Sequence, residues 1–352
     1  MKNLPRPGFK LFLGGVLLSI TLVPSPQLLA ETRVVIIAGK GGTEAYTEKF
    51  GQFALQLHDA LITQHNFSPR QITLLAEPAA QLPATTLPCR FEQLEKIFTE
   101  FSSSLTRDDM LAVILFGHGS DDGAFAKFNL EGPDVRDLDF ARWLERLPCR
   151  RQVFVITTAA SAGFVEKLSR GERIVITATR SAEEKYTTAF PEFFVEAFVK
   201  PAEADLDKDL KVSLLEAFDY ARDRVVRFYE QANRLRPEHP LLDDNADGAG
   251  SEMPSLSFAR VSAGETALQS PDGHLAARTF LLPDTSAEIR AVTLSPGATG
   301  HPLEQTKLKL LAEIEELKAA KASMPAAEYE RDIEALFIRL AKLNREIKAS
   351  KP

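Results

Sequence analysis

The chain has 352 residues, a formal net charge of −7, 44% hydrophobic residues and 26% charged residues. This composition is typical of a globular protein with room for about two domains, and two cysteines are too few for a small scaffold held by disulfides. The negative charge and the lack of a Lys/Arg run argue against nucleic acid as a partner, and neither cysteine has the Cys/His spacing of a zinc site.

Residues 1–30 have the pattern of a secretory signal peptide. Basic residues at Lys2, Arg6 and Lys10 precede an apolar stretch from Leu11 to Val23. The stretch is short for a bilayer span, and no later segment reaches the length that a spanning helix needs. We predict a cleaved signal, a secreted or periplasmic protein, and membrane contact only through this segment. An uncleaved anchor is the alternative.

Residues 31–232 alternate between two patterns. Five short apolar runs without polar alternation predict strands buried on both faces, as in a parallel sheet: 34–38, 72–76, 111–116, 153–156 and 174–178. Apolar residues at helical spacing predict helices around Phe50–Leu61, Leu94–Phe101 and Trp143–Leu147. A group of apolar residues at 190–198 follows the fifth run, and a further helix is predicted from about Leu214 to Tyr229. Strands alternating with helices indicate an α/β sandwich.

The last 120 or so residues change character twice. Residues 233–300 are rich in Pro, Gly, Ser and Asp, which predicts an irregular linker with at most a short strand near Thr279–Leu282. In residues 301–352, apolar residues recur at near-heptad spacing on both sides of Pro325. Two antiparallel helices packed on their own domain would satisfy this pattern, and so would a coiled-coil hairpin that forms a homodimer through these C-terminal helices.

Two strand ends carry the residues most suited to a site. The third run ends in His118, which lies between Gly117 and Gly119, and the fourth run leads into the small residues of Thr157–Gly163. Open α/β sheets place their sites at the carboxyl ends of strands. We therefore expect both strand ends to face one crevice, with His118 left uncrowded by its glycines.

The order of these motifs resembles the legumain-like C13 cysteine peptidases of the caspase-like clan, over residues 33–230. Residues 34–39 with Tyr46 resemble the first strand and loop of that family, and 117–119 with 125–128 resemble its histidine loop and following hairpin. Residues 174–179, followed by Glu184 and Tyr186, resemble its strand and loop beside the substrate pocket. The resemblance implies a caspase-like three-layer α/β/α sandwich with a mostly parallel sheet, to which the C-terminal helical hairpin is added.

The chain departs from that family at the nucleophile. The position of the family's catalytic cysteine is Ala159, and Cys89 and Cys149 precede the second helix and the fourth strand. The arginine that the legumain branch has after its first-loop tyrosine is Thr47. Since loss of a nucleophile typically costs about 10⁶ in turnover, we expect a pseudopeptidase that binds a peptide or protein partner.

An active hydrolase is the alternative. One version is a cysteine-peptidase relative with displaced catalytic groups. The other uses Ser161, because residues 159–163 follow a strand and are close to the small-x-Ser-x-Gly turn of α/β hydrolases. A serine before a helix is ordinarily an N-cap, and we expect that role for Ser161.

A second pattern indicates calcium. Asp205, Asp207, Asp209, Ser213 and Glu216 match the ligand spacing of an EF-hand loop, with Leu210 at the place of its glycine. Ser213 and Glu216 also form the pattern of a helix capping box, which competes with the calcium interpretation. Residues 243–248 repeat the start of such a loop but have Pro254 at its twelfth place, and there we expect a turn rich in Asp and Asn.

Overall fold

The computed structural model describes residues 30–77, 82–255, 271–283 and 324–350, together with the single positions 306, 310, 313, 314 and 317. The predicted signal peptide, except Ala30, lies outside the described residues. No helix in the described part of the chain has the length and apolarity to span a membrane.

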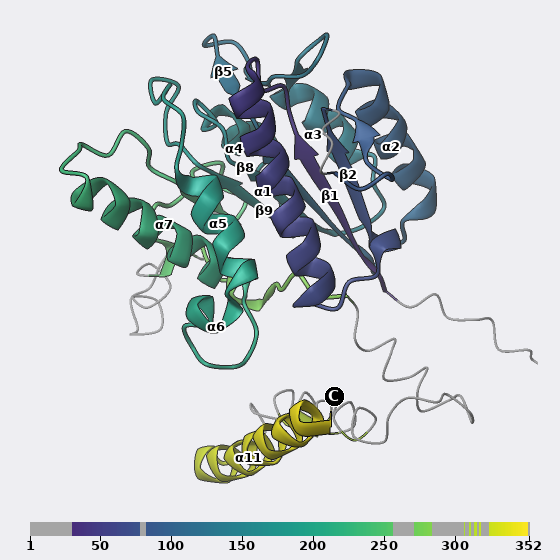
Figure 1. Cartoon of the computed structure of the whole chain (residues 1–352), viewed down its shortest axis with the longest axis vertical. Coiled ribbons are helices and arrows are strands. Elements are labelled where there is room, and N and C mark those ends of the chain that lie inside the picture. Colours follow the sequence, from purple (N-terminus) through teal and green to yellow (C-terminus); the bar gives the residue numbers. More distant parts are fainter. Residues whose placement is uncertain are drawn as a thin grey trace, which may run out of the picture.

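The main sheet has seven strands in the order β10-β9-β8-β4-β1-β2-β3 (Figure 1). Only β10 runs antiparallel to its neighbour. The five predicted strands are confirmed as β1, β2, β4, β8 and β9, and β4 is buried along its whole length because both of its faces are covered. The bounds are β1 Thr32–Ala38, β2 Ile72–Ala76, β3 Leu87–Pro88, β4 Met110–Phe116, β8 Arg151–Ile156, β9 Arg173–Thr177 and β10 Leu241–Asp243.

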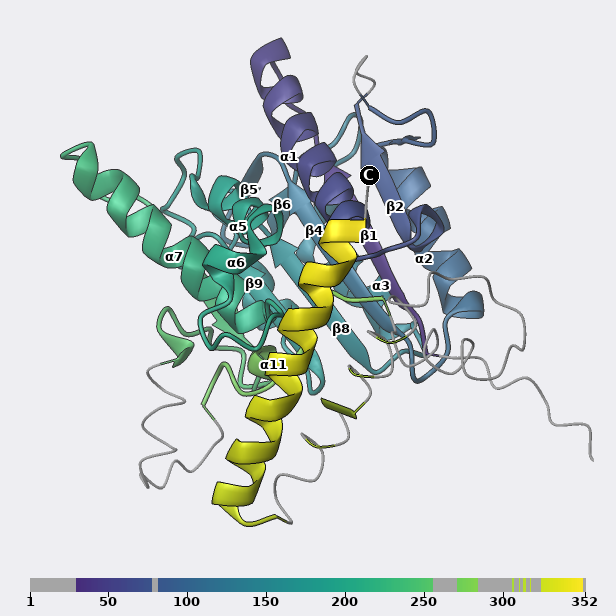
Figure 2. The same ribbon diagram turned by 60° about the horizontal axis from the view of Figure 1, so that its bottom comes forward.

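Helices cover both faces of this sheet. Figure 1 and Figure 2 show α1, α5 and α7 on one side and α2 and α3 on the other. Successive residues of a strand point to opposite faces of the sheet and so belong to different cores. In β1, Val34 and Ile36 pack in the core beneath α1, α5 and α7, whereas Val35 and Ile37 pack in the core beneath α2 and α3. The result is a caspase-like three-layer α/β/α sandwich. The helices are α1 Glu44–Thr63, α2 Phe91–Ser104, α3 Asp137–Glu145, α4 Gly163–Leu168, α5 Phe190–Val199, α6 Pro201–Ala204 and α7 Leu214–Gln231, with 3-10 turns η1 Pro69–Gln71 and η2 Ala276–Arg278.

A second, small sheet follows the histidine. Its strands are β5 Gly119–Asp121, β6 Ala126–Phe128 and β7 Val135–Arg136, paired antiparallel. The hairpin expected after His118 is therefore present.

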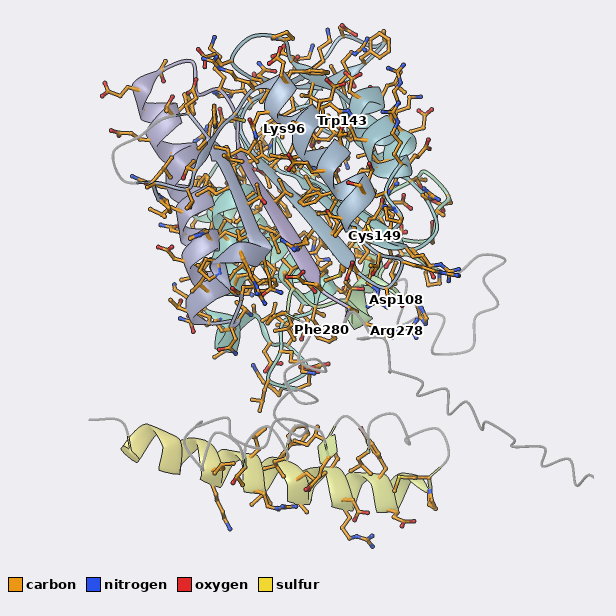
Figure 3. The ribbon with its side chains drawn as sticks, turned by 90° about the vertical axis from the view of Figure 1, so that its right-hand side faces the viewer. Lys96, Asp108, Trp143, Cys149, Arg278 and Phe280 are labelled. Atoms are coloured by element: carbon orange, nitrogen blue, oxygen red, sulfur yellow. The ribbon has the colours of Figure 1, made fainter. Side chains whose placement is uncertain are left out.

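Part of the predicted linker belongs to the α/β domain. Leu241–Asp243 forms β10 at the edge of the main sheet, and Ala276 and Leu281 are buried in the core beside α7. Figure 3 shows Arg278 and Phe280 near Asp108, at the end of the sheet where the parallel strands begin. The sequence pattern missed this packing because turn-rich residues dominate the composition while only a few apolar side chains anchor the segment.

The C-terminal region has a small core of its own. Helix α11 spans Ala326–Ser350, and its Leu340 and Leu343 are buried with Leu310 and Ile314. Arg339 pairs with Glu313 at 3.0 Å. The predicted helix after Pro325 is confirmed, and it packs against the preceding segment of the same chain.

Candidate functional site

His118 lies in the turn between β4 and β5, at the carboxyl edge of the main sheet. Its ring makes edge contacts with Tyr46 and Phe50 of α1, at centroid distances of 4.7 and 5.0 Å. Burial lowers the pKa of His118, and a hydrogen bond with the Gly41 backbone acts in the opposite direction. The imidazole is thus held by two rings and one backbone group from the first loop and helix.

The glycines beside His118 are needed for close packing rather than for open space. A Cβ at Gly117 would lie 2.8 Å from the Phe128 ring, and one at Gly119 would lie 2.3 Å from Thr158 Oγ1. Our expectation that the glycines leave the imidazole uncrowded was therefore wrong. They allow the histidine turn to pass directly over β6 and the end of β8.

His118 and Ala159 line the same small cavity, as expected for the ends of neighbouring strands. Its volume is about 60 Å³, which is room for several water molecules or one small side chain. The other lining residues come from α1, from the histidine turn, from the loop before α5 and from the first turn of α5. They are Lys49, Phe50, Phe53, Gly117, Gly119, Lys185, Thr187, Thr188 and Pro191.

The turn after β8 is held by the loop that follows β9. Ala160 has a left-handed φ of 49°, which costs a residue with a Cβ about 1–2 kcal/mol. Its N–H donates to the carbonyl of Glu184 at 2.9 Å. Thr188 donates its hydroxyl to the Thr157 carbonyl at 2.6 Å. Both contacts fix the two sides of the cavity against each other.

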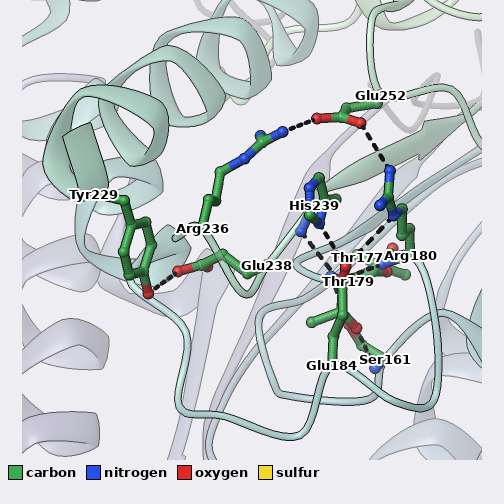
Figure 4. A network of polar contacts seen from close by, with 10 residues as sticks. All are labelled: Ser161, Thr177, Thr179, Arg180, Glu184, Tyr229, Arg236, Glu238, His239 and Glu252. Carbon is green, nitrogen blue, oxygen red and sulfur yellow. Dashed lines mark hydrogen bonds and ion pairs between the residues drawn. The ribbon is translucent and has the colours of Figure 1, made fainter. Parts of the chain in front are cut away.

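Ser161 is fully buried and bonds with Thr179 (Figure 4). Its N–H donates to Thr179 Oγ1 at 2.7 Å, the two hydroxyl oxygens are 3.0 Å apart, and Thr179 N–H donates to Ser161 Oγ at 3.2 Å. The N-cap of α4 is Ala162, and it has no side-chain cap. The expected capping role was therefore wrong: Ser161 joins the ends of β8 and β9.

A polar network supports the loop between β9 and α5 (Figure 4). His239 donates its N–H to Glu184 Oε2 at 3.1 Å, and its Nδ1 lies 2.5 Å from Glu184 Oε1. Arg180 contacts both Glu184 and Glu252. Glu184 thus faces this network from the loop whose Lys185 and Thr187 line the cavity. The sequence marked Glu184 only through the resemblance and had no signal for His239.

Thr47 of α1 and Glu77, which follows β2, lie beside the loop after β1 whose Gly41 backbone bonds to His118. Thr47 Oγ1 donates to Glu77 Oε2 at 2.8 Å, and Gly41 N–H donates to the same oxygen at 3.2 Å. The side chain at the position that the resemblance assigns to the family's arginine is therefore a neutral hydroxyl bonded to a carboxylate. Thr47 has no guanidinium, so it cannot bind an acidic or amide side chain through two parallel hydrogen bonds as an arginine does.

Both cysteines are buried. Burial raises the pKa of Cys89 and of Cys149, with the charge of Glu77 adding to the effect on Cys89. Cys149 precedes β8 and lies toward the end of the sheet where the strands begin (Figure 3). Neither thiol lines the cavity of His118 and Ala159.

The predicted calcium residues gather at the start of α7. Carboxylate oxygens of Asp205, Asp207 and Asp209 lie within 4.8 Å of one another, and Leu210 has a φ of 72° at the glycine place of the loop. Ser213 and Glu216 form the capping box of α7. The Glu216 carboxylate also accepts the N–H groups of Leu206 and Asp207, at 2.8 and 3.1 Å. The cap is confirmed, and calcium binding by this loop stays a prediction.

Comparison with known proteins supports the resemblance. Residues 101–237 match the model of the Peptidase C13 family, and no curated protein matches the chain. The matched segment runs from α2 to the loop after α7 and includes the histidine turn, the turn after β8 and the loop beside the cavity. The part of the chain that carries His118 and Ala159 is therefore similar to the Peptidase C13 family.

Proposed function

We propose that this protein is a secreted C13 pseudopeptidase that binds a peptide segment of a partner protein without cutting it. The observation that carries the proposal is that His118 and Ala159 line one cavity, with a methyl group at the place that the family resemblance assigns to the nucleophile. A methyl group cannot attack a carbonyl, and removal of a nucleophile typically costs about 10⁶ in turnover.

The cavity and its rim suit a peptide ligand. The cavity admits one small side chain, and Lys49 and Lys185 stand beside it without a carboxylate among the lining residues. Tyr186, between Lys185 and Thr187, is 73% exposed. Exposed aromatic rings next to a pocket are common anchors in peptide and protein interfaces.

Secretion rests on the signal-like pattern of residues 1–30. Sequencing the N-terminus of the protein recovered from its host tests this part: a start near Glu31 is expected, and a chain that keeps its apolar stretch would contradict it.

Restoring a thiol tests the pseudopeptidase assignment. In the wild type, Cys89 and Cys149 should resist iodoacetamide until the protein is unfolded, because both are buried and have raised pKa values. Ala159→Cys should add one thiol that reacts in the native state, and adding His118→Gln should slow that reaction. The wild type should hydrolyse no member of peptide, amide or ester libraries. Turnover that His118→Gln abolishes, or fluorophosphonate labelling of Ser161, would overturn the assignment.

Filling the cavity tests the binding role. Ala159→Leu should lower the affinity for peptides selected from a library by at least about tenfold, which is 1.4 kcal/mol. Ala202→Leu, at an exposed alanine of α6, is the matched control and should keep the wild-type affinity. If wild type and Ala159→Leu bind equally, the cavity is not the binding site.

A further inference from the structure

The backbone N–H of Glu31 lies on a buried carboxylate, at the end of the sheet where the parallel strands begin. Glu31 immediately precedes β1, and its N–H donates to Asp109 Oδ1 at 2.6 Å. The Glu31 carbonyl accepts the N–H of Met110, the first residue of β4, at 3.0 Å. The Glu31 side chain pairs with Arg33 at 3.0 Å, so its own carboxylate already has a cation. The start of β1 is thus fastened to the turn before β4.

Asp109 is a buried carboxylate that is bound by neutral donors. The residue is 6% exposed. Its Oδ2 accepts the N–H and the hydroxyl of Thr106 at 2.6 and 2.8 Å, and its Oδ1 accepts the N–H of Glu31. Within the described ranges, Asp109 forms no ion pair. Because buried charges are ordinarily paired, a positive charge at one of these donors would complete the site.

The space beside Glu31 has room for such a charge. Ala30 and Glu31 line a cavity of about 260 Å³ together with the exposed side chains of Asp108, Arg151 and Arg278 (Figure 3). An ammonium group has three N–H donors, and a cavity of this size also admits water. A charged nitrogen in place of the Glu31 amide would therefore need no rearrangement of the strands around it.

We propose that removal of residues 1–30 leaves an α-ammonium group on Glu31 that forms an ion pair with Asp109. Hydrolysis of the Ala30–Glu31 bond consumes one water, and it leaves a carboxylate on Ala30 and an amine on Glu31 that is protonated at neutral pH. The same nitrogen then donates to Asp109 as a cation, and hydrogen bonds between charged groups are roughly twice as strong as neutral ones. Processing would thus strengthen the contact between β1 and β4.

The geometry also selects the bond that is cut. A cut before Ala30 would place the ammonium one residue away from Asp109, and a cut after Glu31 would remove the carbonyl that accepts Met110 N–H. Only a chain that begins with Glu31 keeps both contacts and carries the charge at Asp109. This inference rests on the proposed secretion and is independent of the proposed peptide-binding site.

The reactivity of the α-amine tests the ion pair on the protein recovered from its host. N-terminal sequencing should give Glu31 as the first residue. Acetic anhydride near neutral pH reacts with α-amines ahead of the protonated lysines. It should modify Glu31 of the wild type about tenfold more slowly than Glu31 of Asp109→Asn, because a paired ammonium gives up its proton less readily. Asp108→Asn removes the same charge from an exposed side chain of the same cavity, and this matched control should react like the wild type.

Thermal unfolding gives a second measurement that needs no substitution at Asp109. Acetylation of the α-amine in urea, followed by refolding, removes the positive charge but keeps an N–H that can donate. The acetylated wild type should melt about 2–4 °C below the unmodified protein. Acetylation should leave the Tm of Asp109→Asn unchanged, because the charge has no partner in that variant.

The outcomes separate this inference from the secretion on which it rests. A chain that starts at Glu31 but is acetylated equally fast in the wild type and Asp109→Asn would overturn the ion pair alone. Equal melting temperatures of the acetylated and unmodified wild type would do the same. A chain that keeps its apolar stretch would contradict both the ion pair and the secretion.

Discussion

The side chain at position 159 is a methyl group that shares a cavity with a histidine held at three points. Tyr46 and Phe50 pack on the imidazole of His118, and the Gly41 backbone bonds to it. This support holds the ring beside the cavity whether or not a nucleophile is present. The precise placement of His118 is thus compatible with binding as well as with catalysis.

The lowered pKa of His118 predicts a pH-dependent stability. Because burial lowers the folded-state pKa below the ordinary value of about 6.5, the unfolded chain binds more protons near that pH. The contribution of the neutral His118 imidazole to folding stability is therefore present above about pH 6.5, and it is lost as the pH falls through the folded-state pKa. Urea unfolding between about pH 5 and 8 should show a smaller rise in stability for His118→Gln than for the wild type. Equal slopes would contradict the prediction.

The hydrogen bonds between Ser161 and Thr179 predict that loss of the Ser161 hydroxyl lowers the stability of the fold. Ser161→Ala removes the acceptor of Thr179 N–H in a buried place, and we expect the free energy of unfolding to fall by about 1–3 kcal/mol. Ser102→Ala, at a half-buried position on α2, is the control and should change it by less than about 0.5 kcal/mol. Urea denaturation measures both. A Ser161→Ala protein as stable as the wild type would show that these bonds contribute nothing.

Among the elements, α5 begins with a cap from a distant residue. Its N-cap is Ala189, which has no side-chain cap, and Glu238 instead accepts the N–H groups of Ala189 and Phe190 at 2.7 and 3.0 Å. Tyr229 of α7 donates its hydroxyl to the same carboxylate at 2.8 Å. The carboxylate therefore satisfies donors at the positive end of α5 and connects this helix to α7.

This remote cap predicts that Glu238→Ala lowers the free energy of unfolding by roughly 2–4 kcal/mol, since three donors, two of them buried, lose their acceptor. Glu238→Gln keeps one side-chain oxygen and should cost less. Circular dichroism during urea unfolding measures the free energy of unfolding of the wild type, Glu238→Gln and Glu238→Ala, which should decrease in that order. The explanation fails if glutamine and alanine are equally destabilising, because the cost would then come from charge rather than from lost acceptors.

At the scale of the whole molecule, the C-terminal core shares no residue with the two cores of the α/β domain. Its helix α11 also carries the half-buried Ile333, Leu336 and Phe337 and the 48% exposed Ile338. Apolar side chains that remain accessible on this helix favour association with a second copy.

We therefore predict a homodimer through the C-terminal helices. Sedimentation of the full chain at micromolar concentration should give a dimer, and Leu340→Asp with Leu343→Asp should give a monomer because both leucines lie in the C-terminal core. The double variant should retain the melting transition of the α/β domain. A monomeric wild type would contradict the prediction.

The strands, the main helices and the position of His118 follow from the sequence, because each depends on a local pattern. Runs such as Met110–Phe116 are apolar on both faces only where helices cover a sheet twice, and strand ends in such a sheet meet at one edge. The shared cavity of His118 and Ala159 was predictable for that reason.

Only the tertiary structure decided what depends on residues far apart in the chain. Ser161 bonds to Thr179, Glu238 caps α5, and Asp272 joins the loop that starts at Asp243. No periodicity in the sequence marks such pairs, because hydrogen bonds and charges act over a few ångströms in space and the intervening segments set no fixed spacing. The sequence by itself determined the layered frame and the alanine beside the histidine, whereas folding determined which polar side chains support that frame.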